Sequence, residues 1–407
     1  MAGQVKRFSG GPIGSWCVCA KLRTSNVCIN LIVAGIYIHI PFCNKACHYC
    51  DFHFSTDQRY RKVLIESICA EIDLRAPYLN EAVVETIYFG GGTPSLLTEA
   101  ELQKIFVALQ QTFPIKKGAE ITLEANPEDI SREKISFLRE MGVNRLSIGI
   151  QSFQDETLQK LNRSHSGKQA AVSLEIAQEG GLSNLNADLI FAIPGRSMEQ
   201  LKEDVSTLLR FQPKHISAYG LTIEEKTVFG KWSSMGKFKA VSDEDNANEF
   251  EYLMSTLPEA GLEQYEISNY AMKGFESKHN SSYWRQVPYL GLGPGAHSFD
   301  GKSRQINISN NAGYMSALQD GKSFWTTEVL TQKDHLNEYL LTSLRTREGC
   351  SLDYLERTFN HNLWNLHQDY LQNLMDSGKI MIKNHVLFLT PSGKLIADEI
   401  TRDVFVE

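Results

Sequence analysis

The stretch His39-Ile-Pro-Phe-Cys-Asn-Lys-Ala-Cys-His-Tyr-Cys-Asp-Phe52 carries three cysteines, Cys43, Cys47 and Cys50, with the spacing C-x3-C-x2-C. Soft thiolate ligands suit iron–sulfur centres, so three of them can bind three irons of a [4Fe–4S] cluster. The fourth iron would then stay open to a small molecule. A zinc site or a redox pair is the alternative, but zinc favours four protein ligands and this spacing is unusual for a zinc knuckle.

The composition is that of a globular protein with a sizeable core. The chain has 407 residues, of which 42% are hydrophobic and 22% are charged, and this length predicts about two or three domains. The net charge is −7, without a strongly basic tract, so nucleic acid is not expected as a partner. The sequence contains no run of about 18 apolar residues, so no transmembrane helix is expected. Eight unevenly spaced cysteines do not make a disulfide scaffold, and a low-potential iron–sulfur site indicates the reducing cytoplasm.

The first residues of the chain show no clear hydrophobic period. Residues 1–32 contain scattered cysteines and glycines, and strand-like order begins only at Ile36. A short, weakly apolar patch in this segment lacks the cleavage site of a signal peptide. We therefore expect residues 1–32 to be a disordered extension, or translated upstream sequence with the natural start near Val33.

Between residues 33 and 220, short β-branched runs alternate with amphipathic helical stretches. This alternation predicts an α/β fold with a parallel sheet, and six repeats would form a partial (β/α)6 barrel. Functional side chains then belong at the C-terminal ends of the strands. The predicted strands are Ile36–Ile40, Thr86–Phe89, Glu120–Glu124, Arg145–Ile150, Asn184–Leu189 and His215–Tyr219.

The rest of the chain divides into two parts. Residues 221–325 are less regular and are interpreted as an extension that flanks the barrel. Residues 326–407 predict a winged-helix-like α+β domain, although this fold does not by itself indicate DNA binding. Its expected elements are helices over His335–Leu344, Leu352–Phe359 and Leu363–Ser377, and a hairpin of Lys379–Ile382 with Val386–Leu389.

Two motifs follow directly on predicted strands. Gly90-Gly-Gly-Thr-Pro94 would let the backbone approach a ligand closely, although a tight strand-to-helix turn is the alternative. Glu124-Ala-Asn-Pro127 ends the third strand with a carboxylate that could hold ribose hydroxyls. The alternative there is a helix-capping Asn126 beside a solvated Glu124.

Three further polar residues are candidates for the same site. Gln151 ends the fourth strand, and Asp188 interrupts an otherwise mostly apolar fifth strand. Because a charged side chain is seldom buried without a partner, a structural ion pair between Arg163 and Asp188 is the alternative to a ligand-binding role.

The segment His279-Asn-Ser-Ser-Tyr-Trp284 joins a histidine to two aromatic side chains. Histidine can ligate haem iron and aromatic rings can line a macrocycle, so His279 is a haem candidate. A lone histidine is more often a satisfied structural residue, and this alternative stays open. Met272, His297 and His48 are weaker candidates.

Taken together, these motifs resemble the radical S-adenosylmethionine (SAM) superfamily over residues 36–400, and more narrowly its branch of oxygen-independent coproporphyrinogen III dehydrogenases and haem chaperones of the HemW type. The resemblance implies that the three cysteines hold the cluster and that SAM binds the open iron. It also implies a set of SAM contacts: Tyr37, Gly91, Gly92, Thr93, Glu124, Gln151, Arg163 and Asp188.

One position separates the two groups within this branch. The dehydrogenases resemble C-x3-C-x2-C-x-C, whereas Phe52 stands here at the fourth cysteine position, as in HemW-like chains. The resemblance thus implies a haem chaperone that passes haem to an unidentified acceptor protein, with the cluster and SAM required for the transfer or regulating it. A porphyrinogen-oxidising radical SAM enzyme is the alternative, so the sequence leaves open whether the chain is an enzyme. A DNA-binding regulator is disfavoured by net charge. A peripheral membrane contact would suit haem delivery, although no amphipathic segment indicates one.

Overall fold

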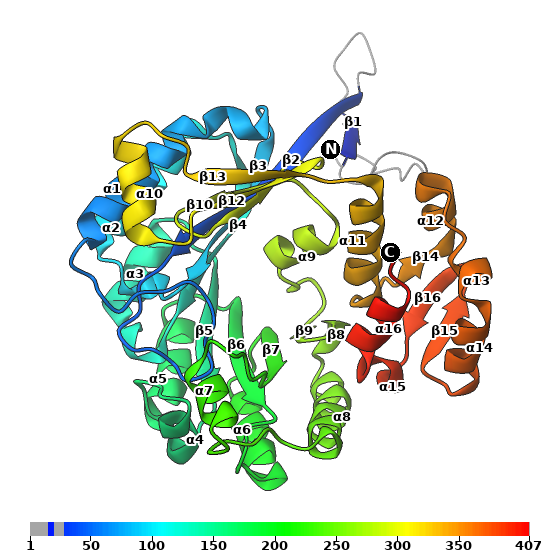
Figure 1. Ribbon diagram of the computed structural model, residues 1–407. Coiled ribbons are helices and arrows are strands. Elements are labelled where there is room, and N and C mark those ends of the chain that lie inside the picture. The colour runs from blue at the N-terminus through cyan, green and yellow to red at the C-terminus, as the bar shows by residue number, and fades with distance from the viewer. Residues whose placement is uncertain (1–14, 20–27, 407) are drawn as a thin grey trace.

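The computed structural model describes residues 15–19 and 28–406 of the chain. Its largest feature is a curved sheet in which six parallel strands follow one another in chain order (Figure 1). All six predicted strands are present, and other strands continue the sheet at both ends of this run, so the parallel strands form a partial barrel. They are β2 (Cys28–Ile40), β3 (Val83–Gly91), β4 (Ile115–Ala125), β5 (Arg145–Gln151), β6 (Leu185–Phe191) and β7 (His215–Gly220).

Helices cover the outer face of these strands (Figure 1). Three of them begin with a capping box, which satisfies free N–H groups of the first turn. The helices are α1 (Arg61–Leu74), α2 (Glu99–Thr112), α3 (Arg132–Glu140), α4 (Asp155–Lys160), α5 (Gly167–Glu179) and α6 (Met198–Arg210).

The strands divide apolar and polar side chains between their two faces. Along β5, Leu146, Ile148 and Ile150 are fully buried in the core beneath the helices. The alternate positions, from Arg145 to Gln151, face the interior of the barrel and line a pocket there. Because side chains of a strand alternate between faces, this pattern builds a barrel that is apolar outside and polar inside.

The N-terminal segment differs from its prediction. Strand β2 begins at Cys28 rather than near Ile36, and β1 (Ser15–Cys19) pairs antiparallel with its first residues. The described residues 15–19 and 28–32 therefore form strands, where a disordered extension was predicted. Residues 1–14 and 20–27 lie outside the described part of the chain.

The region 221–325 is more regular than its sequence pattern predicts, and it extends the sheet at both edges. Strands β9 (Asn269–Ala271) and β8 (Glu263–Glu266) follow β7, and β10 (Tyr289–Leu292) pairs parallel with β2. Beyond β10 lie β11 (His297–Phe299), β12 (Ser303–Asn307) and β13 (Trp325–Val329). The helices of this region are α7 (Val228–Ser234), α8 (Asp243–Glu259), α9 (Lys278–Trp284) and α10 (Asn311–Gln319).

The C-terminal part has its own hydrophobic core, with Leu340, Leu355 and Leu371 fully buried. The predicted hairpin is present as β15 (Ile380–Lys383) and β16 (Val386–Leu389), and β14 (Cys350–Ser351) completes a small sheet. The helix predicted over Leu363–Ser377 is interrupted at His367. The helices are α11 (Gln332–Leu344), α12 (Leu352–Phe359), α13 (Leu363–Leu366), α14 (Gln368–Asp376), α15 (Pro391–Lys394) and α16 (Ala397–Asp403). In the described part of the chain, no helix is long and apolar enough to cross a membrane.

Candidate cluster and cofactor site

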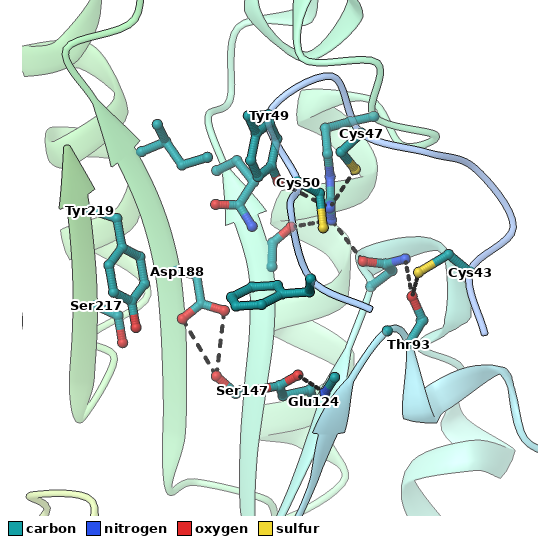
Figure 2. A pocket seen from close by; sticks show the side chains of 18 of the residues that line it. Cys43, Cys47, Tyr49, Cys50, Thr93, Glu124, Ser147, Asp188, Ser217 and Tyr219 are labelled. Carbon is teal, nitrogen blue, oxygen red and sulfur yellow. Dashed lines mark hydrogen bonds between the residues drawn. The ribbon is translucent and has the colours of Figure 1, made fainter. Parts of the chain in front are cut away.

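A pocket of about 420 Å³ opens where the parallel strands end and reaches into the barrel (Figure 2). The loop after β2 brings the three cysteines to its edge, while β3, β4, β5, β6 and β7 supply its walls. Ten of the predicted site residues line this pocket: Cys43, Cys47, Cys50, Gly91, Gly92, Thr93, Glu124, Gln151, Arg163 and Asp188. Tyr37 and His279 are not among the lining residues.

The cysteine loop is tied to the barrel at both of its ends. Near Cys43, the N–H of Thr93 donates to the carbonyl of Phe42 at 2.7 Å, and the Thr93 hydroxyl lies 3.4 Å from the Cys43 sulfur. Near Cys47, the N–H of His48 donates to the carbonyl of Leu161 at 3.1 Å. Backbone hydrogen bonds to neighbouring segments of the chain therefore position the cysteine loop.

The donor set fits an iron–sulfur cluster better than a single metal ion. The three thiols are free and partly buried, and burial raises the pKa of Cys50 to about 12 and raises that of Cys43. A bound metal centre would supply the positive charge that makes these thiols thiolates. Among the described residues, no three His, Cys, Asp or Glu side chains gather around one ion position. In a cluster each cysteine binds a different iron, so three thiols suffice, whereas zinc favours four protein ligands.

The glycines at the end of β3 are required by the close packing of the protein itself. Gly91 has φ +104°, and a Cβ there would lie 2.5 Å from the ring of His39. A Cβ at Gly92 would lie 2.7 Å from the carbonyl oxygen of Phe42. Glycine thus lets this turn pack against the cysteine loop while it also lines the pocket. The two roles that the sequence presents as alternatives are combined here.

Glu124 faces the pocket as a hydrogen-bonded side chain. Its carboxylate accepts from the hydroxyl of Tyr88 at 2.7 Å and from the N–H of Gly91 at 3.2 Å. Burial, helped by the negative charge of Asp188, raises the pKa of Glu124 to about 7. The alternative of a solvated glutamate beside a capping asparagine is wrong, because the Asn126 side chain makes no cap and accepts from Arg163 instead.

Arg163 lies under the cysteine loop and connects it to β5. Its Nη2 donates to Asn126 Oδ1 at 2.7 Å and to the Gly149 carbonyl at 2.8 Å, and its Nη1 lies 3.5 Å from the Cys47 sulfur. The predicted alternative, an ion pair with Asp188, is absent from the described residues. Asp188 accepts from Asn186 at 2.7 Å, and burial raises its pKa to about 6.

Gln151 occupies the end of β5 in an unusual backbone conformation. Its φ is +64°, the left-handed region, which is strained for a residue other than glycine. The side chain is buried against the pocket at the predicted position. Strain of this kind, held at the end of a barrel strand, is typical of functional sites.

His279 is a fully buried residue of α9. Nδ1 lies 2.8 Å from the Thr86 hydroxyl, Nε2 lies 2.7 Å from the Tyr283 hydroxyl, and burial lowers the pKa to about 3. Its ring stacks on Tyr88, as does that of Tyr37. Both ring nitrogens are thus occupied by protein partners, which favours the structural alternative. The weaker candidates Met272, His297 and His48 are also absent from the pocket lining.

Several lining residues escape the sequence analysis. They lie at alternate positions of the strands, and their signal is a polar side chain at every second position of an otherwise apolar run. Most of them lie at the start or in the middle of a barrel strand rather than at its C-terminal end. They include Tyr88, Arg145, Ser147, Asn186, Ser217 and Tyr219.

Comparisons with known proteins agree with this arrangement. Residues 37–208 match the family model of the radical SAM superfamily, and residues 330–396 match that of the HemN C-terminal domain. The haem chaperone HemW of Bacillus subtilis is 35% identical over 368 residues, which cover 89% of this chain and 97% of that protein. The HemW of Mycobacterium tuberculosis is 32% identical over 373 residues, or 90% of this chain and 94% of that protein.

One solved structure supports the fold over nearly the whole chain. Coproporphyrinogen III oxidase (HemN) from Escherichia coli aligns with a TM-score of 0.78 and covers 92% of this chain and 90% of its own. At 21% sequence identity, this likeness concerns the fold alone.

A partial barrel with a cysteine loop at the mouth of its pocket defines the class of radical SAM proteins, which implies a [4Fe–4S] cluster and SAM as cofactors. Within this class, the likeness to relatives runs through both the barrel and the C-terminal domain. The chain belongs to the haem chaperone HemW family.

Proposed function

We propose that the protein binds haem and transfers it to an acceptor protein, with a [4Fe–4S] cluster and exchangeable SAM in its barrel. The observation that carries this proposal is the likeness to proteins named haem chaperone HemW, which spans 89% of this chain and 97% of the B. subtilis relative. Because both parts of the chain are included, the relatives share the whole architecture and not only the cofactor site.

Cys43, Cys47 and Cys50 are proposed as the cluster ligands, because they are the free thiols that line the pocket. SAM carries a sulfonium cation, which suits a pocket with the carboxyl groups of Glu124 and Asp188. When both are bound, the reduced cluster can supply an electron to SAM. The proposed SAM contacts that line the pocket are Gly91, Gly92, Thr93, Glu124, Gln151, Arg163 and Asp188. Tyr37, also predicted as a contact, does not line the pocket, and its ring stacks on Tyr88.

The alternative function is the oxidation of a porphyrinogen. Phe52, at the position where the dehydrogenases are expected to carry a fourth cysteine, has a side chain that is 69% exposed at the edge of the pocket. No thiol is therefore available there, which makes the alternative less favoured.

The experiment is anaerobic reconstitution of the cluster, followed by haem titration with and without SAM and by transfer to a haem-free acceptor. We expect a Soret shift with about one haem per chain and haem release to the acceptor. A reconstituted protein that binds no haem, or that converts coproporphyrinogen III to protoporphyrinogen IX, would overturn the chaperone proposal.

The role of His279 is tested in the same titration. Because both ring nitrogens are bound to the protein, we expect His279→Ala to lower the melting temperature and to leave the haem stoichiometry unchanged. His279→Gln, which can keep part of the hydrogen bonding, is the matched control for the fold. Loss of haem from both variants at unchanged cluster content would assign His279 as a haem ligand.

A further inference from the structure

Arg145 is a buried cation without a partner. It lies at the start of β5 with 1% of its surface exposed, and it is the largest fully buried side chain among the described residues. Within that part of the chain, none of Nε, Nη1 and Nη2 has a hydrogen-bond partner, and no carboxylate lies within 4.0 Å to form an ion pair. Guanidinium carries five N–H donors and stays charged, so such burial is costly unless something accepts these bonds.

The guanidinium lies at the floor of the pocket. Arg145 lines the cavity together with Ser147, Gly149 and Gln151, which occupy the same face of β5. Gln151 stands at the strand end near the cysteine loop, so Arg145 lies about 20 Å further along the strand at about 3.3 Å per residue. A ligand that enters from the cysteine loop would meet Arg145 at its inner end.

A second unpartnered group lies beside it. Thr122 of β4 is paired with Arg145 in the strand register, and its hydroxyl is fully buried without a hydrogen-bond partner. A hydroxyl and a guanidinium on neighbouring strands can both donate to the same oxygen-bearing group.

Several other polar groups of the interior are already paired with one another. The amide of Asn186 donates to Ser147 at 2.7 Å and accepts at 2.6 Å from His215, which in turn contacts Tyr265. Glu124 is held by Tyr88 and Gly91 rather than by Arg145. These groups are thus satisfied, whereas the donors of Arg145 and the hydroxyl of Thr122 are free among the described residues.

We propose that Arg145, assisted by Thr122, is a carboxylate-binding subsite at the floor of the pocket. A planar guanidinium matches a carboxylate in bidentate geometry, which no other free group of this pocket offers. This inference rests on the proposed function for its two sources of carboxylate: the propionate of a haem, and the methionyl carboxylate of a SAM molecule that is not bound to the cluster.

The test compares each ligand with a form that lacks the carboxylate. SAM is compared with decarboxylated SAM, and haem with haem dimethyl ester, by titration of reconstituted protein, Arg145→Met and Arg145→Lys. For the ligand that reaches Arg145, we expect the wild-type protein to bind the carboxylate form at least tenfold more tightly. In Arg145→Met this preference should fall below about threefold, and Arg145→Lys should keep an intermediate preference because it retains the charge without the fork.

The ligand pairs identify the source. If only the haem preference depends on Arg145, a propionate occupies the subsite; if only the SAM preference does, the methionyl carboxylate occupies it. If both preferences persist in Arg145→Met, the subsite proposal is overturned. A wild-type protein that binds no haem would instead contradict the proposed function, and the SAM pair alone would then decide the subsite.

Discussion

Two arginines line the same pocket, and they differ in their hydrogen-bond partners. At the rim, Arg163 is bound to Asn126 and to the Gly149 carbonyl and lies beside the Cys47 sulfur. At the floor, Arg145 is more deeply buried and has no partner among the described residues. At the rim, the hydrogen bonds of Arg163 help to hold the cysteine loop in place. At the floor, the donors of Arg145 are free to bind a ligand.

The largest effect is expected at the rim, from the loss of a cysteine. Cys43→Ala, Cys47→Ala and Cys50→Ala should each abolish the brown absorbance of the cluster, because an iron would lose its thiolate. Absorbance spectra and iron content of reconstituted protein measure this. Cys69→Ala is the matched control, since Cys69 lies on α1 and does not line the pocket. An intact cluster in any of the three variants would refute the ligand assignment.

The second effect compares the two arginines directly. Arg163→Met should destabilise the protein by about 2–4 kcal/mol, because Asn126 and the Gly149 carbonyl would lose a charged donor. Arg145→Met, in the absence of ligand, should cost less than about 1 kcal/mol or should stabilise, since it removes an unpaired buried charge. Melting temperatures of the two cluster-free variants provide the measurement. Equal losses would show that the fold depends on both arginines alike.

A smaller effect is expected from Glu124, which lies between rim and floor. Its pKa is raised from 4.5 to about 7, so the folded protein holds a proton that the unfolded chain releases in this range. This carboxyl therefore makes stability fall as pH rises from about 4.5 to 7, by about 1–3 kcal/mol. Glu124→Gln should remove that part of the decline in unfolding midpoints between pH 5 and pH 8. The exposed Glu251→Gln should not change the profile, and an unchanged slope in Glu124→Gln would contradict the burial of this charge.

The smallest effect is expected from Phe52, at the outer edge of the rim. Its side chain is 69% exposed, so Phe52→Ala should change stability by less than about 0.5 kcal/mol. Cluster content should stay at the wild-type level, because no thiol is removed. Melting temperature and iron content measure both, and a lost cluster would mean that Phe52 shields it.

The parallel strands could be predicted because their apolar runs repeat with a regular spacing, and the strand ends are where a barrel keeps its functional groups. The strand ends indicate Glu124 and Gln151, the spacing of the thiols indicates the three cysteines, and a charge within an apolar strand indicates Asp188; all line the pocket. The role of Arg145 could not be predicted in this way, because Arg145 lies at the N-terminal end of its strand, whereas the rule considers only the C-terminal ends.

Other differences arise from contacts that no local pattern shows. The short strands β8 to β13 are stabilised by pairing with a sheet edge, which only the fold supplies. The break at His367 divides a segment whose apolar spacing is compatible with one helix. His279 carried a plausible ligand type, but its burial between Thr86 and Tyr283 depends on α9 packing against β3.

The anchoring of the cysteine loop bears on what happens to the protein when its cluster is lost. Because Thr93 and Leu161 hold the loop by backbone hydrogen bonds, part of its anchoring comes from the protein and not from the cluster. Small zinc domains behave differently, since they unfold when the metal leaves. We therefore expect that oxygen damage to the cluster leaves a folded chain that repair systems can reload, instead of one that must be degraded and synthesised again.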